Sequence, residues 1–211
     1  MKPILFNTDM VRAILDGRKT VTRRIIKGQD KKTMFDGNFF AAGLYDKETM
    51  KRVIEPPYKE GEVLYIRETW RKITDTEYGY RADCHKADDN VFSWKPSIHM
   101  PKEAARLFLR ITNVRAAKLQ DMGLEDYLKE GIYIKNYEVT LSGSNQFLTI
   151  PEREKAMEHK REAVARDKFV ELWNSTAGKP NSPERIANNW YANPFVWVIE
   201  FEVITDEELK A

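Results

Sequence analysis

The amino-acid sequence predicts an α+β fold in which short strands curl into a barrel-like sheet with a few flanking helices. Alternating polarity, typical of strands, occurs at 63–67, 107–114 and 195–204. Helical spacing is confined to a few segments, and strands and helices do not alternate in the order of a doubly wound parallel sheet. The 211 residues, 42% of them hydrophobic, are enough for a single domain, 1–211, with its own core.

The N-terminal residues predict a helix and then an extended segment. Asn7 offers an N-cap, Gly17 offers a stop, and the apolar residues between them have helical spacing: Met10, Val11, Ile14 and Leu15. Residues 18–26 mix β-branched residues with cations, which favours an extended chain. Alternate side chains then face opposite ways, with Lys19, Val21 and Arg23 on one side and Thr20, Thr22 and Arg24 on the other.

Two stretches, at about 28–55 and 135–165, lack a clear periodic spacing of hydrophobic residues and are predicted to be insertions. The first is expected to be a loop or weakly structured, and the second to include an exposed tip at 142–145. Between the two insertions, a short helix is expected at 121–130, closed by Gly131.

A charged helix is predicted to begin at the capping-box sequence Thr149-Ile150-Pro151-Glu152 and to end near Gly178. Its later part carries one stripe of side chains: Phe169, Leu172, Trp173 and Thr176. The clearest strand of the chain, 195–204, is apolar on both faces at its start and half-solvated at its end.

Composition excludes several classes of protein. No apolar run approaches the roughly 20 residues that cross a bilayer, and the N-terminus lacks the apolar stretch of a secretory signal. We therefore expect a soluble, cytoplasmic protein with no membrane partner. Cys84 is the only cysteine, and the three histidines are widely spaced, so neither a disulfide, a metal site nor a cofactor is expected.

The formal net charge of +2 is unevenly distributed along the chain. Residues 1–32 contain nine Lys or Arg and three acidic residues, a local charge of +6, which leaves −4 for the remainder. Such an imbalance is consistent with a solvated basic face or with an anionic partner near the N-terminus.

The basic character is concentrated at residues 17–24, Gly-Arg-Lys-Thr-Val-Thr-Arg-Arg. Arginine offers a planar fork for phosphate or carboxylate, lysine a point charge or a tunable amine, and threonine a hydroxyl. The segment is not a P-loop, because no G-x-x-x-x-G-K-[ST] frame precedes it and a strand follows. A solvated strand and an anion site both remain open.

Three further segments offer polar or aromatic groups. Glu68 ends a strand, where it would pair with a cation of residues 17–24 or face a ligand, with Trp70 as a stacking wall. Two prolines restrain the loop from which Ser97 and His99 project. Glu130 lies in the last turn of a predicted helix, where the helix dipole disfavours a carboxylate, and this position indicates a role.

Together and in this order, these segments resemble the ASCH-domain family, whose β-barrel fold is related to the PUA domain. The closer resemblance is to its phage and prophage branch, whose members open with a helix followed by G-R-K-T-x-T-R-R. The matching segments are 3–8, 17–24, 61–70, 80–82, 94–101, 119–132, 172–175 and 190–201. The resemblance implies a PUA-like barrel with flanking helices, in the cytoplasm of a bacterial host.

Some small ASCH proteins are amidohydrolases that remove the acetyl group of N4-acetylcytidine, and their catalytic residues match Lys19, Thr22 and Glu130. The resemblance implies that Lys19 acts as a base for the Thr22 hydroxyl while Glu130 handles protons on the leaving nitrogen. Like charge from neighbouring arginines would lower the pKa of Lys19. The expected ligand-binding residues are Arg18, Thr20, Arg23, Arg24, Glu68, Trp70, Arg81, Trp94, Ser97 and His99.

Three functional hypotheses follow. The first is recognition of RNA, a nucleotide or a nucleoside, with amide hydrolysis on a modified nucleoside as its enzymatic form. The second is an RNA-binding or ribonuclease-like module without amidase activity, which would use Arg18, Arg23 and Arg24 for phosphate. The third is a phage accessory or morphogenesis protein that acts through a protein partner. In that case the charged helix at 150–168 would be the surface that binds the partner.

Overall fold

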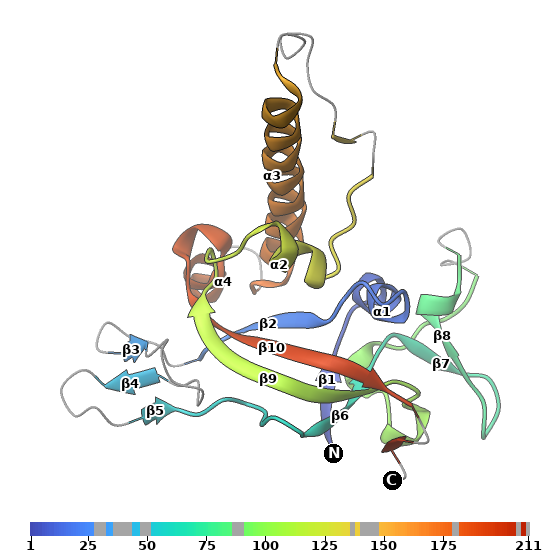
Figure 1. Cartoon of the computed structure of the whole chain (residues 1–211). Helices are drawn as coiled ribbons and strands as arrows, with labels where there is room; N and C mark the ends of the chain where they lie inside the picture. The colour runs from blue at the N-terminus through green and yellow to red at the C-terminus, as the bar shows by residue number, and fades with distance from the viewer. Residues whose placement is uncertain are drawn as a thin grey trace.

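A curved five-stranded sheet forms the centre of the computed structural model, with strand order β1-β6-β9-β10-β2 (Figure 1). The structure describes residues 1–27, 33–35, 44–46, 52–85, 91–135, 138–139, 148–178, 182–205 and 208–209. In sheet order the strands are β1 (Lys2–Leu5), β6 (Val63–Arg67), β9 (Phe108–Lys118), β10 (Phe195–Ile204) and β2 (Val21–Ile25). β1 and β6 are parallel, and the other neighbouring pairs are antiparallel.

Two small sheets and four helices complete the described part of the chain. The small sheets contain β3 (Thr33–Phe35), β4 (Leu44–Asp46) and β5 (Arg52–Ile54), and β7 (Trp70–Lys72) and β8 (Tyr78–Tyr80). The helices are α1 (Thr8–Leu15), α2 (Leu124–Lys129), α3 (Ile150–Thr176) and α4 (Pro183–Asn188). The predicted α+β class is confirmed. Within the described ranges, no helix has the length and apolar character needed to cross a membrane.

The predicted barrel is not closed. β1 and β2 form the two edges of the sheet and do not pair with each other. β1 contains Pro3, which has no N–H to donate and is therefore typical of an edge strand. Instead, a guanidinium N–H of Arg24 in β2 donates a hydrogen bond of 2.7 Å to the carbonyl oxygen of Leu5 in β1. A side chain, and not a backbone ladder, therefore spans the seam between the two edges.

The capping residues begin two helices where the sequence predicts them. Asn7 accepts a hydrogen bond of 2.8 Å from the backbone N–H of Met10 and begins α1. Gly17, with φ +70°, follows the end of this helix. Thr149 and Glu152 form the predicted capping box of α3, in which the Glu152 carboxylate accepts from the Thr149 backbone N–H at 2.9 Å.

Side chains of β10 alternate between two hydrophobic clusters. Trp197, Ile199 and Phe201 belong to one cluster, and Val196 and Val198 belong to the other. α1 contributes to the first cluster, whereas α2 and α3 contribute to the second. This alternation explains why the beginning of the strand is apolar on both faces.

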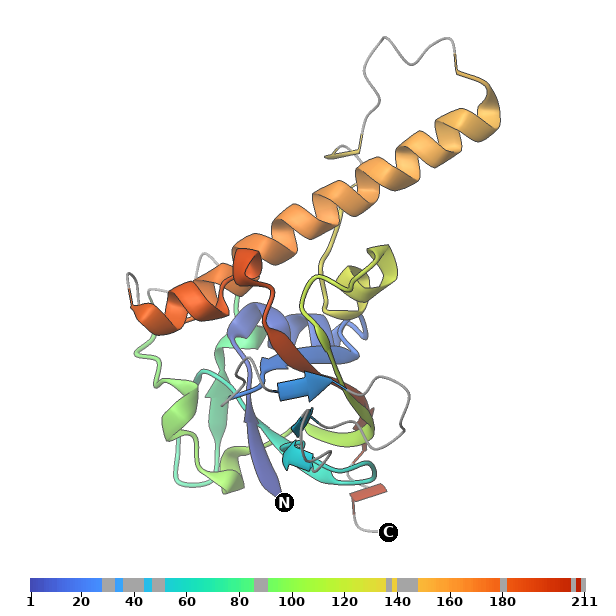
Figure 2. The ribbon, with the colours of Figure 1, turned by 90° about the vertical axis from the view of Figure 1, so that its left-hand side faces the viewer.

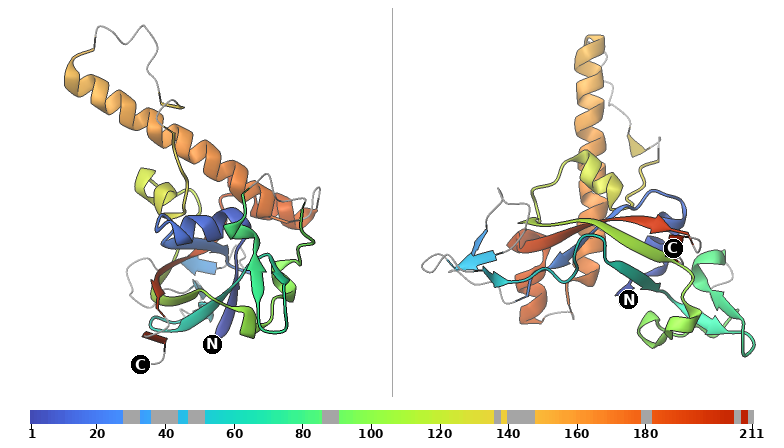
Figure 3. Two further views of the ribbon diagram at one scale, coloured as in Figure 1. Left: turned by 90° about the vertical axis from the view of Figure 1, so that its right-hand side faces the viewer. Right: turned by 60° about the horizontal axis from the view of Figure 1, so that its bottom comes forward.

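Helix α3, of 27 residues, rises from the sheet and projects well beyond it, as Figures 2 and 3 show. Its buried residues, Ala165, Phe169 and Trp173, all lie in the C-terminal half that contacts the body. The N-terminal half is charged and forms a protruding arm.

The predicted insertions differ from the structure in part. The described residues of the first one contain the strands β3, β4 and β5, which are too short and irregular to give a period. In the second, regular helix begins at Ile150, while the predicted tip at 142–145 lies outside the described residues. β9 extends four residues beyond its predicted end at Val114, and α2 is shorter than predicted because it begins at Leu124.

Candidate functional site

Charged side chains from three segments form one buried ion network. An oxygen of Glu130 lies 2.6 Å from the Nζ of Lys19, and its other carboxylate oxygen lies 3.1 Å from a guanidinium nitrogen of Arg23. The second terminal nitrogen of Arg23 lies 2.8 Å from Asp126. The side chains of Lys19, Arg23 and Glu130 are 0%, 1% and 5% exposed. Shielding from water strengthens these interactions and makes the loss of any partner costly.

The Lys19 ammonium group is saturated with acceptors. It donates to the carboxylate of Glu130 at 2.6 Å, to the backbone carbonyl of Glu130 at 2.9 Å and to that of Val21 at 2.7 Å. Burial lowers the pKa of Lys19, and the nearby Glu130 carboxylate opposes this shift. The three contacts show that Lys19 fixes the position of Glu130.

The backbone brings Lys19 and Glu130 together. The two residues form an isolated antiparallel bridge, and the Thr20 N–H donates to the Lys129 carbonyl at 2.9 Å. Gly131 follows with φ +92°, and a Cβ atom there would lie 2.8 Å from the Cβ of Ala13. A side chain at this position would therefore be strained and would collide with α1. The glycine that closes α2 thus allows Glu130 to approach Lys19.

Asp126 supports the network from one helical turn before Glu130. Burial raises the pKa of its carboxyl group, but the hydrogen bond from Arg23 outweighs burial, so the pKa lies below its usual value. Asp126 therefore remains ionised at neutral pH and holds the side of Arg23 that faces away from Glu130.

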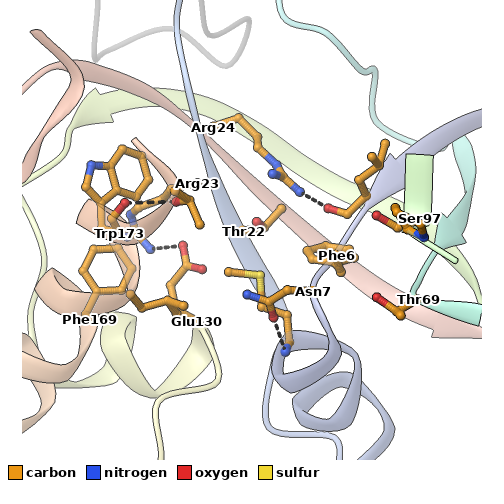
Figure 4. Close-up of a pocket in the computed structure, with 15 residues that line it drawn as sticks. Phe6, Asn7, Thr22, Arg23, Arg24, Thr69, Ser97, Glu130, Phe169 and Trp173 are labelled. Carbon is orange, nitrogen blue, oxygen red and sulfur yellow. Dashed lines mark hydrogen bonds and ion pairs between the residues drawn. The ribbon is translucent and has the colours of Figure 1, made fainter. Parts of the chain in front are cut away.

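Glu130 reaches the wall of a cavity of about 330 Å³ at the seam between β1 and β2 (Figure 4). Three aromatic side chains, Phe6, Phe169 and Trp173, contribute to this wall. Its polar side chains are Asn7, Thr22, Arg23, Arg24, Thr69, Ser97, Glu130 and Thr176. Lys19 is not on the wall. The cavity therefore presents a fixed carboxylate, hydroxyls and cations beside aromatic surface.

Thr22 and Arg24 approach the cavity from β2. Among the described residues, the Thr22 hydroxyl has no hydrogen-bond partner, although the residue is only 3% exposed. The Arg24 guanidinium lies 5.3 Å from the centre of the Phe6 ring, a distance within the range of cation–π interactions. These side chains have donor capacity that a ligand could use.

The structure brings together six of the sequence-predicted site residues. Five of them are on the cavity wall: Thr22, Arg23, Arg24, Ser97 and Glu130. The sixth, Lys19, lies behind the wall in contact with Glu130. Residues 17–24 therefore contribute to the cavity as predicted in position, while Lys19, which the resemblance matches to a catalytic residue, contacts Glu130 from behind the wall.

Five other predicted residues lie away from the cavity wall. Arg18 pairs with Asp16 and donates to the Gly131 carbonyl, and Thr20 and His99 are exposed. Arg81 lies in a short 3-10 helix, and Trp94 packs edge-on against Phe92.

Two expectations about residues 68–70 are wrong. Glu68 pairs with Arg106, at 2.9 and 3.2 Å, and not with a cation of residues 17–24. Trp70 packs with Tyr78 and Met100 and is not on the cavity wall, so it does not serve as a stacking wall for a ligand there. Trp70, at the start of β7, belongs to a separate small cluster with Met100 and Ala104, and Arg106 provides the counterion of Glu68.

Several residues of the site carry no prediction of a functional role from the sequence, among them Phe6, Asp126, Phe169 and Trp173. Phe6 was grouped with the apolar entry to α1, and Asp126 carried no signal beyond its place in a short helix. Phe169 and Trp173 stood out only as an apolar stripe on α3. That stripe is the available signal, because all four of its residues line the cavity: Phe169, Leu172, Trp173 and Thr176.

No family model, curated protein or solved structure matches this chain. Among the described residues, no group of three or more His, Cys, Asp or Glu side chains is arranged to hold a metal ion. The geometry of the site is therefore the basis for a functional assignment.

Proposed function

We propose that the cavity binds a nucleoside or nucleotide and that the chain is a nucleotide-recognising protein of the ASCH type. The observation that carries this proposal is the Glu130 carboxylate, which Lys19 and Arg23 hold at the wall of an aromatic-lined cavity. A volume of about 330 Å³ lies within the range of small-molecule sites. The order of motifs around residues 17–24 supports the same assignment.

A nucleobase matches the chemistry of the wall. Aromatic rings such as Trp173 contribute apolar wall against which a base would pack, and an oriented carboxylate accepts hydrogen bonds from an exocyclic amino group. Because Lys19 and Arg23 already hold Glu130 in place, binding would require little further ordering of this carboxylate.

Amide hydrolysis on a modified base is the enzymatic form of this proposal, favoured by Thr22 and Glu130 on one wall. Glu130 would accept a proton from water as the water oxygen attacks the amide carbonyl carbon. The C–N bond then breaks, and the proton passes to the leaving nitrogen, so that N4-acetylcytidine and water give acetic acid and cytidine. Thr22 would donate a hydrogen bond to the carbonyl oxygen, and Lys19 would position Glu130.

A cavity-filling variant tests the binding proposal without altering Glu130. Ser97 is on the wall, whereas His99 in the same short helix is exposed and off it. Ser97→Trp should therefore abolish the binding of nucleosides, measured by titration calorimetry, while His99→Trp should leave it intact. Equal binding by both variants would place the nucleoside elsewhere.

Hydrolysis is tested separately by the release of cytidine from N4-acetylcytidine. Wild-type protein should turn over this compound, and Thr22→Val should slow the reaction with little change in binding. Binding without turnover at high protein concentration would reject the hydrolase and retain the recognition function.

A further inference from the structure

The Arg24 guanidinium is the one arginine of residues 17–24 whose charge is not neutralised by a described carboxylate. Arg18 pairs with Asp16, and Arg23 pairs with Asp126 and Glu130. Arg24 instead donates a single hydrogen bond, to the Leu5 carbonyl, and has no ion-pair partner among the described residues. Since a guanidinium carries five N–H donors, most of its capacity is unused.

Arg24 lines both the cavity and a second hollow. This hollow has a volume of about 310 Å³ and shares four wall residues with the cavity, namely Arg23, Arg24, Trp173 and Thr176. Beyond them it is lined by Lys27 and by residues of α4 and the end of α3. The shared residues place the two hollows next to each other, with Arg24 on the wall of both.

The second hollow has an excess of positive charge. Lys27 is exposed and has no ion-pair or hydrogen-bond partner among the described residues. Among the described residues, Glu184 of α4 is the one acidic side chain on this wall, and it is also exposed. With Arg23 neutralised by its carboxylates, Arg24 and Lys27 exceed Glu184 by one unit of charge.

We infer that Arg24 and Lys27 form a phosphate subsite, so that the ligand is a phosphorylated nucleotide, free or within a strand. The inference rests on the proposed function, because the cavity must hold the base whose phosphate reaches the second hollow. A phosphate oxygen would replace or supplement the Leu5 carbonyl as acceptor of Arg24, and a guanidinium fork suits two phosphate oxygens at once. Lys27 would contribute a second, mobile charge.

Affinity ratios test this subsite. Four nucleosides and their 5′- and 3′-monophosphates are titrated into the full chain, and the ratio of nucleotide to nucleoside affinity is recorded. We expect a ratio of at least about tenfold in the wild type, the usual effect of hydrogen bonds to a charged group. Arg24→Gln and Lys27→Gln should reduce the ratio, whereas Glu184→Gln should increase it because an opposing charge is removed.

Arg110 provides the matched control, since it pairs with Glu202 on the surface and is not on the walls of either hollow. Arg110→Gln should leave both affinities unchanged. An equal loss of ratio in Arg110→Gln and Lys27→Gln would overturn the subsite in favour of a general charge effect.

The failures of the two proposals are distinguishable. Nucleosides that bind as tightly as their monophosphates would overturn the phosphate subsite and leave the nucleoside cavity standing. Absence of binding by every nucleoside and nucleotide would overturn both. A short single-stranded RNA that binds more tightly than any monophosphate, with loss in Arg24→Gln, would support the subsite and identify a strand as the source of the phosphate.

Discussion

Lys19 and Glu130 lie 111 positions apart in the sequence but are joined by a 2.6 Å contact between Nζ and a carboxylate oxygen, in surroundings that exclude water. The backbone of the two residues forms a β-bridge as well. The pair fixes α2 against the start of β2, and its carboxylate faces the cavity. Stability and ligand binding therefore depend on the same contact.

Removal of either partner should destabilise the fold strongly. Lys19→Met and Glu130→Gln are each expected to lower the free energy of unfolding by about 3–5 kcal/mol, because a buried charge loses its counterion. The double variant should cost at least about 1 kcal/mol less than the sum of the two, the signature of a direct interaction. Urea denaturation measures all three values, and strictly additive losses would show that the pair is not coupled.

Replacement of Gly131 should displace Glu130 as well as strain the backbone. Gly131→Ala meets both a positive φ and a Cβ contact of 2.8 Å with Ala13, whereas Gly61→Ala, at φ +79°, meets no atom within 4 Å. The control isolates backbone strain, expected to cost about 1–2 kcal/mol. Gly131→Ala should cost more and should also weaken nucleoside binding. The same loss of stability in both, with binding unaffected, would contradict the role of Gly131.

The Glu68 carboxyl group should make stability depend on pH. Burial raises the pKa of Glu68, and Arg106 opposes this effect. Because the folded-state pKa exceeds the unfolded one, the folded protein retains this proton more strongly, and ionisation as the pH rises reduces the free energy of unfolding.

Glu68→Gln tests this dependence, since glutamine does not ionise. Relative to the variant, the wild type should lose stability as the pH rises above the usual glutamate pKa of about 4.3. Urea denaturation at several pH values gives the difference. A wild-type advantage that grows with pH would mean that Arg106 outweighs burial.

Trp173 should report on the ligand by fluorescence. Trp173 lines the cavity, and its ring centre lies 6.0 Å from that of Phe169, on which it stacks. Trp94 is not on the cavity wall. Nucleoside binding should quench the wild-type emission, and Trp173→Phe should remove the quenching. Trp94→Phe should retain it. Trp173→Phe also loses the hydrogen bond to the Asn188 carbonyl, at a cost of about 1 kcal/mol.

Local sequence patterns predict most helices and strands, but not whether the two edge strands of the sheet pair with each other. The caps at Asn7 and Thr149 are short-range signals, and the structure contains both. Whether β1 and β2 pair depends on the curvature of five strands assembled from distant segments, which no local period encodes. The strand pattern predicts a curled or barrel-like sheet and the resemblance a PUA-like barrel, but whether the sheet closes is determined only by the three-dimensional arrangement of the strands.

The sequence likewise predicts part of the site but not which charged residues pair within it. Residues 17–24 stood out by charge and Glu130 by its unfavourable place at a helix end, and the structure unites them. Sequence alone left open whether Glu68 or Glu130 meets Lys19, because both follow short elements far along the chain. It also gave no sign that three of the four cations from Arg18 to Arg24 are engaged by carboxylates.

The central claim is that a nucleoside or nucleotide binds in the cavity beside Glu130, and titration calorimetry of wild type and Glu130→Gln tests it most directly. Glutamine keeps the shape of the side chain but removes the charge, and variants are compared under conditions where circular dichroism shows both folded. We expect the wild type to bind and Glu130→Gln to lose at least about tenfold in affinity, as expected for hydrogen bonds to a charged acceptor. Equal affinity in the two proteins would contradict it.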